Sequence, residues 1–568
     1  MNASFGARHF SKREKCLAPI LVWGMLSVMA LGSAEAAVSP RAPAAIRRLA
    51  IQHNGRLKPF DSFARETLER ITGSAQRGGE DPVATVLQML ASPEPWQAKP
   101  LIAVPFHPLR GPLGLGPQTA SVSYNDLVAS KKLMRMLPVI VEKQRQDEKL
   151  SMLDNETMDV FERFVAFSNL SEQRLWLVPP PPGSLEREWQ SILDPAGYAP
   201  PQQQALKSAW TVLLAAVRQG QPQAIDASAT GLAEALRAAN PAAYPPAWRL
   251  ELEVFYNHAA PFHIARLLYL LAVVSLLWAL VKPGRAGSLG LSACGTAFAV
   301  HGAGILMRVV IGGRPPVSNF FETMLWLPFV GVLIALVFER IYLPAPRLRQ
   351  AGRANYFALG ASILAVIALV LADYVPLDPG VSPVVAVLRS NLWLTVHVLT
   401  VVASYGALAL ATVLAHIYSV QYLLARRGRR QALEALDTFL YRVIQVGVVL
   451  LAGGIMLGAV WANASWGRYW GWDPKETWAL ITLLWYLAVL HGRFAEWLSG
   501  IGVALATIGG FLLLLMTYYG VSFYLVGLHS YAGGHAKPLP VLLVAYLAAE
   551  AAFLLVVGLA ALRRRAAS

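Results

Sequence analysis

Cysteine is scarce in this sequence, and so is charge. The chain holds two cysteines, Cys16 and Cys294, and no CxxC or CxxCH motif. These absences exclude a disulfide framework, a dithiol redox site and a covalently bound haem of the c type. Charged residues make up only 15% of the chain and hydrophobic ones 55%, which is too apolar for a soluble protein. The composition is typical of a polytopic membrane protein.

Acidic residues are outnumbered by basic ones, which gives a formal net charge of +15. Such a charge can indicate nucleic-acid binding. We reject that interpretation because the Lys and Arg residues cluster in short loops between apolar segments, where membrane topology explains them. We therefore predict no nucleic-acid partner.

The first 37 residues have the pattern of a secretory signal peptide. Lys12, Arg13 and Lys15 precede an apolar run over about 17–31, and the small-residue sequence Ala34-Glu-Ala36 follows. An uncleaved N-terminal membrane helix is the alternative. Either interpretation predicts that the following segment is exported.

The rest of the chain divides into two unlike parts. Residues 38–262 are polar to mixed and long enough for one domain, and patches of helical periodicity predict a mainly helical exported domain of unknown role. From residue 263 onward, nine apolar segments recur that are each long enough to cross a bilayer as a helix. They span about 264–282, 289–311, 321–343, 354–372, 393–422, 441–461, 476–498, 501–520 and 541–562. The predicted fold class is an all-α polytopic membrane protein with about nine transmembrane helices.

Basic residues orient these helices. If 38–262 is outside, the inner loops hold most of the Lys and Arg, including the clusters at 426–430 and 563–565, and the outer loops hold few. This satisfies the positive-inside rule. We expect a bacterial inner-membrane protein with its N-terminal domain on the periplasmic side.

Two histidines fall on the predicted outer face. His397 begins the 393–422 span, and His529 follows the 501–520 span. Neutral imidazoles on separate helices can bind a haem iron from both sides. This placement makes His397 and His529 candidate axial ligands.

A tryptophan-rich loop, predicted over 461–478, opens on the same face and contains WGRYWGWDPKETW. Its rings at Trp466, Trp470, Trp472 and Trp478 could hold a porphyrin, while Arg468 or Lys475 could bind the propionates. The alternative is an aromatic belt at the membrane interface. A belt does not explain so many tryptophans in one loop.

Three other histidines lie within predicted spans. His491, at the inner end of the 476–498 span, could bind a second, deeper haem, because ionisable groups inside membranes are often functional. His416 lies at similar depth and could be its opposite ligand, and His301 lies in mid-span. A hydrogen-bonded structural role is the alternative for His416 and His301.

The loop resembles the tryptophan-rich WWD signature of the haem-handling family that includes CcsA/ResC, CcmC and CcmF, through Trp466-Gly-x-x-Trp470-x-Trp472-Asp473-Pro474-x-Glu476-x-Trp478. The segment RPPVSNFFE at 314–322, WLTVHVLTVVASYGAL around His397 and GVSFYLVGLHSYA around His529 are similar to the CcsA/ResC branch, the membrane subunit of System II cytochrome c synthases. The stretch LAIQHNGRLKPFDSFARE resembles the exported segment of CcsB–CcsA fusions.

This resemblance implies a role in cytochrome c biogenesis as a haem lyase acting on haem b. It implies that His397 and His529 are axial ligands, that Trp466, Trp470, Trp472 and Asp473 form the platform, and that His491 receives haem from the inner side. The implied partners are an apocytochrome with CxxCH and a CcsB/ResB-like subunit. That subunit would supply a second inner histidine, unless His416 or His301 substitutes for it. A thioredoxin-like thiol reductant is a further candidate partner.

Three other functions remain open on the sequence alone. A haem exporter or chaperone would hand haem on without forming thioethers. A membrane electron-transfer subunit would keep its haem through turnover. A solute transporter is the third, but it leaves the tryptophan loop unexplained, and no broken-helix repeat is evident.

Overall fold

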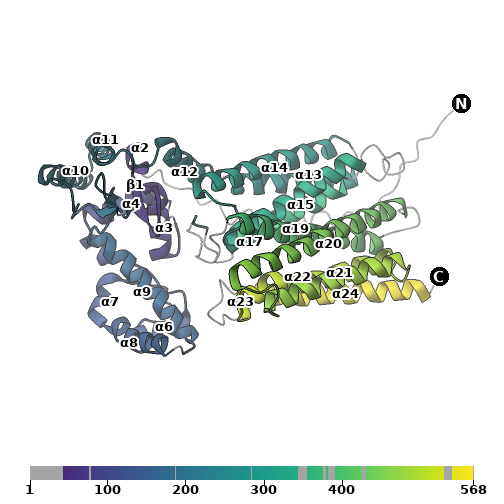
Figure 1. Ribbon diagram of the computed structural model, residues 1–568. Coiled ribbons are helices and arrows are strands. Elements are labelled where there is room, and N and C mark those ends of the chain that lie inside the picture. The colour runs from purple at the N-terminus through teal and green to yellow at the C-terminus, as the bar shows by residue number, and fades with distance from the viewer. Residues whose placement is uncertain are drawn as a thin grey trace.

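The computed structural model describes residues 42–75, 79–146, 148–185, 187–282, 284–342, 355–374, 379–381, 391–424, 430–529 and 540–566. The predicted signal segment, 1–37, lies outside these residues. The described chain forms two parts, an N-terminal domain that ends with α12 (Ala247–Ala259) and a bundle of long helices that starts with α13 (Pro261–Val281) (Figure 1). The domain sits at one end of the bundle.

The N-terminal domain is mainly helical, as predicted. Its helices before α12 are α2 (Ala44–Arg47), α3 (Phe60–Thr72), α4 (Pro82–Ala91), α5 (Glu94–Gln97), α6 (His107–Leu113), α7 (Tyr124–Ser130), α8 (Lys132–Arg145), α9 (Met152–Ser171), α10 (Pro200–Gln219) and α11 (Pro222–Ala239). Helix α3 forms because its apolar residues recur at helical spacing, so that Phe63, Leu68 and Ile71 are buried in the domain core. Helix α9 begins with a capping box formed by Ser151 and Asp154.

Two small antiparallel sheets were not foreseen from the sequence. Strands β1 (Ala50–His53), β2 (Arg56–Pro59), β5 (Trp176–Val178) and β6 (Gln190–Ser191) form one sheet in the order β2-β1-β5-β6, and β3 (Pro100–Ala103) pairs with β4 (Ser121–Ser123) in the other. The β1–β2 hairpin turns at Asn54 and Gly55, which both have positive φ, as the Asn-Gly pair favours.

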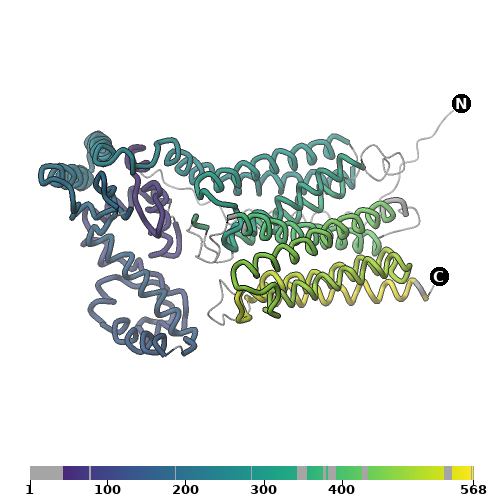
Figure 2. Tube along the Cα trace, in the orientation of Figure 1, coloured from purple at the N-terminus to yellow at the C-terminus, as the bar shows by residue number. Residues whose placement is uncertain are grey.

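A buried ion pair and a hydrogen bond hold α12, the last helix of the domain, against β2 and α3. Arg56 on β2 makes two hydrogen bonds to Glu253 of α12, at 2.7 and 2.8 Å, and Ser62 of α3 donates a third at 2.6 Å. Helix α12 continues into α13 through Ala260, whose φ of 43° produces the bend (Figure 2). The domain boundary at 262/263 stays a prediction from the sequence.

The bundle confirms the polytopic all-α prediction. Its helices after α13 are α14 (Arg285–Gly312), α15 (Phe320–Tyr342), α17 (Tyr356–Tyr374), α18 (Asn391–Trp393), α19 (Leu399–Leu424), α20 (Arg430–Trp466), α21 (Pro474–Phe494), α22 (Gly500–Leu515), α23 (Val521–Tyr524) and α24 (Val541–Ala566), with π-helical turns η3 (Leu394–Val398) and η4 (Met516–Gly520). Eight helices in the described part are long and apolar enough to cross a membrane.

One of the nine predicted spans, 476–498, forms helix α21 but is not among those eight. The mean hydropathy of α21 is reduced by its polar and aromatic residues, which include two tryptophans, a tyrosine, a histidine and an arginine. It nevertheless packs lengthwise against α20 and α22. Helix α20 is much longer than predicted: its 37 residues reach Trp466, so the connecting loop covers only 467–473 rather than 461–478.

Helix α19 is at the centre of the bundle and packs against α15, α17, α20 and α22. Small residues allow this close packing. At Gly406 a side chain would collide with the carbonyl oxygen of Leu327, so α15 and α19 approach each other almost backbone to backbone. Helix α24 lies at the periphery with most of its surface exposed.

The two ends of the bundle differ. Helix α23 and the start of α21 lie at the end that faces the N-terminal domain, and the last turn of α24, with Arg564, lies at the opposite end (Figure 1). We call these the domain-facing end and the far end. The candidate site lies at the domain-facing end.

Candidate functional site

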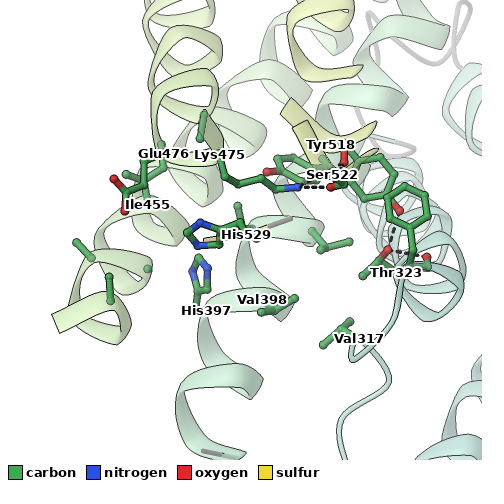
Figure 3. A pocket seen from close by; sticks show the side chains of 18 of the residues that line it. Val317, Thr323, His397, Val398, Ile455, Lys475, Glu476, Tyr518, Ser522 and His529 are labelled. Atoms are coloured by element: carbon green, nitrogen blue, oxygen red, sulfur yellow. Dashed lines mark hydrogen bonds between the residues drawn. The ribbon is translucent and has the colours of Figure 1, made fainter. Parts of the chain in front are cut away.

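A cavity of about 410 Å³ opens in the bundle at the domain-facing end. This volume is within the range of small-molecule sites. Its walls come from the start of α15, from η3 and α19, from α20, from the start of α21, and from η4 with the segment that follows α23. His397 and His529 both line it, and their rings face each other in Figure 3.

His397 lies in the π-helical turn η3, which distorts the start of the α19 span. Such turns are frequent at functional sites. Its Nδ1 is 2.9 Å from the carbonyl oxygen of Gly454 on α20, so Nδ1 donates and the lone pair is on Nε2. The ring fits against Gly458, where a Cβ would lie 2.6 Å from the Cε1 of His397. Helix α20 therefore both orients this imidazole and leaves space for it.

His529 is held by Asp473. Its Nδ1 lies 2.8 Å from the Asp473 Oδ1, and the aspartate is only 6% exposed. Burial raises the pKa of Asp473, but the hydrogen bond from His529 and those from the backbone outweigh it and lower the pKa to about 2. A charged carboxylate therefore fixes the Nδ1–H tautomer of His529, as a second-shell group does for many metal-binding histidines.

Asp473 also builds the local backbone. It is the N-cap of α21, where it accepts a hydrogen bond from the Lys475 N–H at 2.9 Å, and its Oδ2 accepts one from the Leu528 N–H at 2.6 Å. Glu476 completes a capping box by accepting from the N–H groups of Gly471 and Asp473. The aspartate of the tryptophan loop thus joins the start of α21 to the segment that carries His529.

Trp461 contacts both histidines and was not singled out in the sequence. Its ring stacks on His397 with 6.1 Å between centroids and 13° between planes, and lies 5.9 Å from His529 at 52°. Trp466, at the end of α20, packs edge-on against Trp461 at 4.7 Å and against His529 at 5.1 Å. The one available sequence signal was that Trp461 ends the 441–461 span beside the loop.

The other loop tryptophans are placed differently. Trp470 lines the cavity together with Tyr469, whereas Trp472 is 69% exposed and is not part of the cavity wall. Trp472 packs edge-on against Trp470 at 5.8 Å and has a φ of 56°. That positive φ is unusual for a large side chain, and strained backbone of this kind clusters at binding sites.

The two predicted propionate-binding residues, Lys475 and Arg468, lie in different surroundings. Lys475 lines the cavity, and its Nζ donates to the Ser522 Oγ at 2.8 Å (Figure 3). Arg468 is not in the cavity wall. It lies over the Trp466 ring, and its guanidinium is 3.6 Å from the Glu476 carboxylate.

The segment 314–322 forms the wall opposite the tryptophan loop. Glu322 is 2% exposed and pairs with Arg308 at 3.0 Å and with Arg314 at 2.7 Å, which fixes the turn before α15. Phe320 then stacks on Tyr518 of η4 at 4.5 Å, and the Tyr518 hydroxyl hydrogen-bonds Thr323 at 2.7 Å. The cavity therefore has aromatic surface on two sides.

The remaining histidines lie elsewhere. His491 is exposed near the far end of α21, with its Nδ1 bonded to the Leu487 carbonyl. His416 is paired at both nitrogens, with Glu550 at 2.9 Å and the Thr412 carbonyl at 2.8 Å. His301 is fully buried among aromatic rings. The structure brings none of the three together, and within the described residues no group of three or more His, Cys, Asp or Glu could hold a metal ion.

Fold and site together define a class of protein: a multi-pass membrane protein with two oriented imidazoles in an aromatic cavity at one end of its bundle. Comparison with known proteins specifies it further. The family model described as "Cytochrome C assembly protein" matches residues 317–529, which begin and end at the cavity.

Similar proteins of known role point to the same family. The cytochrome c biogenesis protein CcsA of Synechococcus sp. (strain CC9605) is 35% identical over 292 residues, 46% of this chain and 93% of that protein. CcsA of Prochlorococcus marinus (strain MIT 9312) is 36% identical over 253 residues, 40% of this chain and 79% of that protein. Protein NrfI of Wolinella succinogenes is 31% identical over 517 residues, 86% of this chain but only 54% of NrfI. The NrfI match is longer than the bundle and so extends into the N-terminal domain.

The chain belongs to the CcsA family of cytochrome c biogenesis proteins. Its role is in cytochrome c biogenesis, the process that attaches haem to apocytochromes. The resemblance predicted from the tryptophan loop and the two histidine segments is confirmed.

Proposed function

We propose that the chain is a haem lyase, which holds haem b as a substrate in the cavity and presents it to the CxxCH motif of an apocytochrome. One observation carries this proposal. His397 and His529, far apart in sequence, line one cavity, and each has its Nδ1 committed to an acceptor in the protein. This is the arrangement that orients imidazoles for iron through Nε2.

The cavity residues fit the rest of the porphyrin. Trp470 with Tyr469 on one side, and Phe320 with Tyr518 on the other, offer flat apolar surface, and Trp466 packs behind the wall against His529. Lys475 lies in the wall, and in the part of the chain that the structure describes its Nζ donates only to neutral acceptors, the Ser522 hydroxyl and the Tyr518 carbonyl, so we assign it to a propionate. Arg468 is paired with Glu476, and Trp472 lies outside the cavity wall. These two residues would contact haem only at the rim of the cavity or after a rearrangement.

The chemistry asked of the protein is positioning. Each cysteine S–H of the CxxCH motif adds across one vinyl group, so that sulfur bonds to the inner vinyl carbon and hydrogen to the outer one, with no oxidant consumed. Holding the vinyl groups beside the thiols converts a bimolecular step into a local one and can supply several kcal/mol. The thiols must be reduced, because the thiolate is the nucleophile.

The path of haem and the partners are part of the same proposal. Haem enters from the inner side near His491, which becomes one ligand of a deeper site. A CcsB/ResB-like subunit supplies the second ligand there, since His416 is already paired with Glu550. A thioredoxin-like reductant keeps CxxCH reduced, and the cavity faces the periplasm of a bacterial inner membrane.

The test is thioether formation in a reconstituted system. Purified chain, with its partner subunit, is mixed with haem and a reduced CxxCH peptide, and the pyridine haemochrome spectrum is followed. We expect the shift that accompanies saturation of the vinyl groups. Haem binding without that shift would favour the exporter or chaperone, and a haem that stays bound while it cycles between redox states would favour the electron-transfer subunit.

Release of the product provides a second test. The histidine of CxxCH would replace one of the protein's imidazoles on the iron. A CxxCA peptide should therefore form thioethers but remain bound. Release equal to that of CxxCH would contradict this step.

A further inference from the structure

Among the described residues, Trp461 is the one side chain whose ring contacts both candidate ligands, and it lies outside the tryptophan pattern of 466–478. It is 4% exposed and lies at the end of α20 beside the cavity-lining residues Gly458 and Ala462. Its plane is almost parallel to His397 and steeply inclined to His529. The two imidazole planes are therefore neither parallel nor perpendicular to each other.

A second observation argues that this indole is not ordinary core packing. Its Nε1–H is buried and has no hydrogen-bond partner among the described residues. Leaving a buried donor unpaired costs free energy, and native structures seldom do so without a functional reason. A phenylalanine at this position would fill much of the same space without that cost.

We propose, on the basis of the proposed haem function, that Trp461 is a positioning residue that sets the relative orientation of the two axial imidazoles. Gly454 and Asp473 fix which nitrogen of each ring faces the iron, but one hydrogen bond to each ring still permits some tilt of its plane. The indole face restrains His397 by stacking. Its contact with His529, together with Trp466, restrains the second ring.

Ring orientation has consequences for the iron. The angle between two axial imidazole planes determines how the d orbitals of low-spin ferric iron split, and it therefore changes the g values in electron paramagnetic resonance. Restrained rings give one sharp set of g values and free rings a broad distribution. The same restraint keeps the ligands ready for exchange with the histidine of CxxCH.

The test compares haem-loaded wild type with Trp461→Phe and with Trp497→Phe, an exposed tryptophan at the far end of the bundle. We expect Trp461→Phe to keep its low-spin haem, because both ligands remain, but to show shifted or broadened g values and a several-fold lower yield of thioether product. Trp497→Phe should match wild type in both measurements.

Two results have opposite meanings. A Trp461→Phe protein with the g values and yield of wild type would overturn this inference, since a purely structural indole predicts no change or a gain in stability. If wild type itself binds no haem, the proposed function fails instead. Should Trp461→Phe not accumulate, Trp461→Tyr is measured in its place with the same two outcomes.

Discussion

The Asp473 carboxylate accepts a hydrogen bond from the His529 imidazole at 2.8 Å while it caps α21 and holds the Leu528 N–H. One side chain thus couples a candidate ligand to the start of a helix. The aspartate of the tryptophan signature is explained by this geometry, because an acceptor that is charged and buried is needed to fix both.

We predict that Asp473→Asn weakens haem binding without removing the ligand. The amide can keep one of the accepted hydrogen bonds, but it loses the charge that favours the Nδ1–H tautomer of His529. Loss of such a second-shell group typically costs about 10–100-fold in metal affinity. Haem titration followed by absorption measures this, with Asp437→Asn as control, since Asp437 pairs with Arg493 away from the cavity. Equal affinities for the two variants would contradict the prediction.

Two glycines on α20 offer a matched pair. A Cβ at Gly458 would meet the His397 ring at 2.6 Å, whereas a Cβ at Gly453 would meet nothing within 4 Å. Overpacking typically costs about 1–3 kcal/mol, so Gly458→Ala should reduce haem affinity by about tenfold or more, and Gly453→Ala should leave it unchanged. The same low-spin spectrum at the same haem concentration in both variants would show that His397 does not occupy this position when haem is bound.

The ion pair between His416 and Glu550 predicts a structural role for His416 rather than a role as a haem ligand. We expect His416→Ala to leave the absorption spectrum of the haem bound by His397 and His529 intact. It should destabilise the protein by about 1–3 kcal/mol, because the Glu550 carboxylate loses its partner inside the bundle. Spectra and thermal unfolding in detergent are compared with His107→Ala, a change in the N-terminal domain. A lost haem population in His416→Ala alone would instead make His416 a ligand.

The N-terminal domain should lose stability in acid through Glu66. Burial raises the pKa of Glu66, but the neighbouring His53, Lys58 and Arg56 lower it to about 2. A carboxyl group whose pKa is lower in the folded than in the unfolded protein stabilises the fold fully at pH values above the unfolded-state pKa. For Glu66 this stabilisation is lost as the pH falls from about 4.5, the unfolded-state pKa, to about 2, the folded-state pKa. The stability advantage of wild type over Glu66→Gln should therefore be present at neutral pH and vanish near about pH 2–3.

Thermal unfolding of the full-length protein in detergent, at a series of pH values, measures that difference. Glu251→Gln serves as control, since Glu251 forms an ion pair in which both side chains are about half exposed. A constant gap between wild type and Glu66→Gln down to the acid limit would contradict the prediction.

Hydropathy and topology predicted much of this architecture from the sequence. The apolar runs located the long helices, and the basic loops indicated which ends share a face, which brought His397, His529 and the tryptophan loop together. Strands of two to four residues are too short for a periodic signal, so both sheets were missed. The roles of Trp461 and Gly458 depend on how α20 packs against η3, a tertiary relationship that one sequence does not reveal.

Side-chain direction was the other gap. Arg468 and Lys475 are equivalent in the sequence as cations in one loop. The N-cap at Asp473 starts α21 so that Lys475 lies in the cavity wall, while Arg468 turns toward Glu476. Likewise Trp470 and Trp472 are two residues apart, yet the positive φ of Trp472 leaves its ring exposed.

The central claim is that His397 and His529 are the axial ligands of a bound haem, and an absorption spectrum tests it most directly. Protein purified from a haem-replete host should show a low-spin haem spectrum. His397→Ala/His529→Ala should lose that spectrum and regain it when imidazole is added. Wild type that carries no haem and binds none when it is supplied, or a double variant with an unchanged spectrum, would contradict the account.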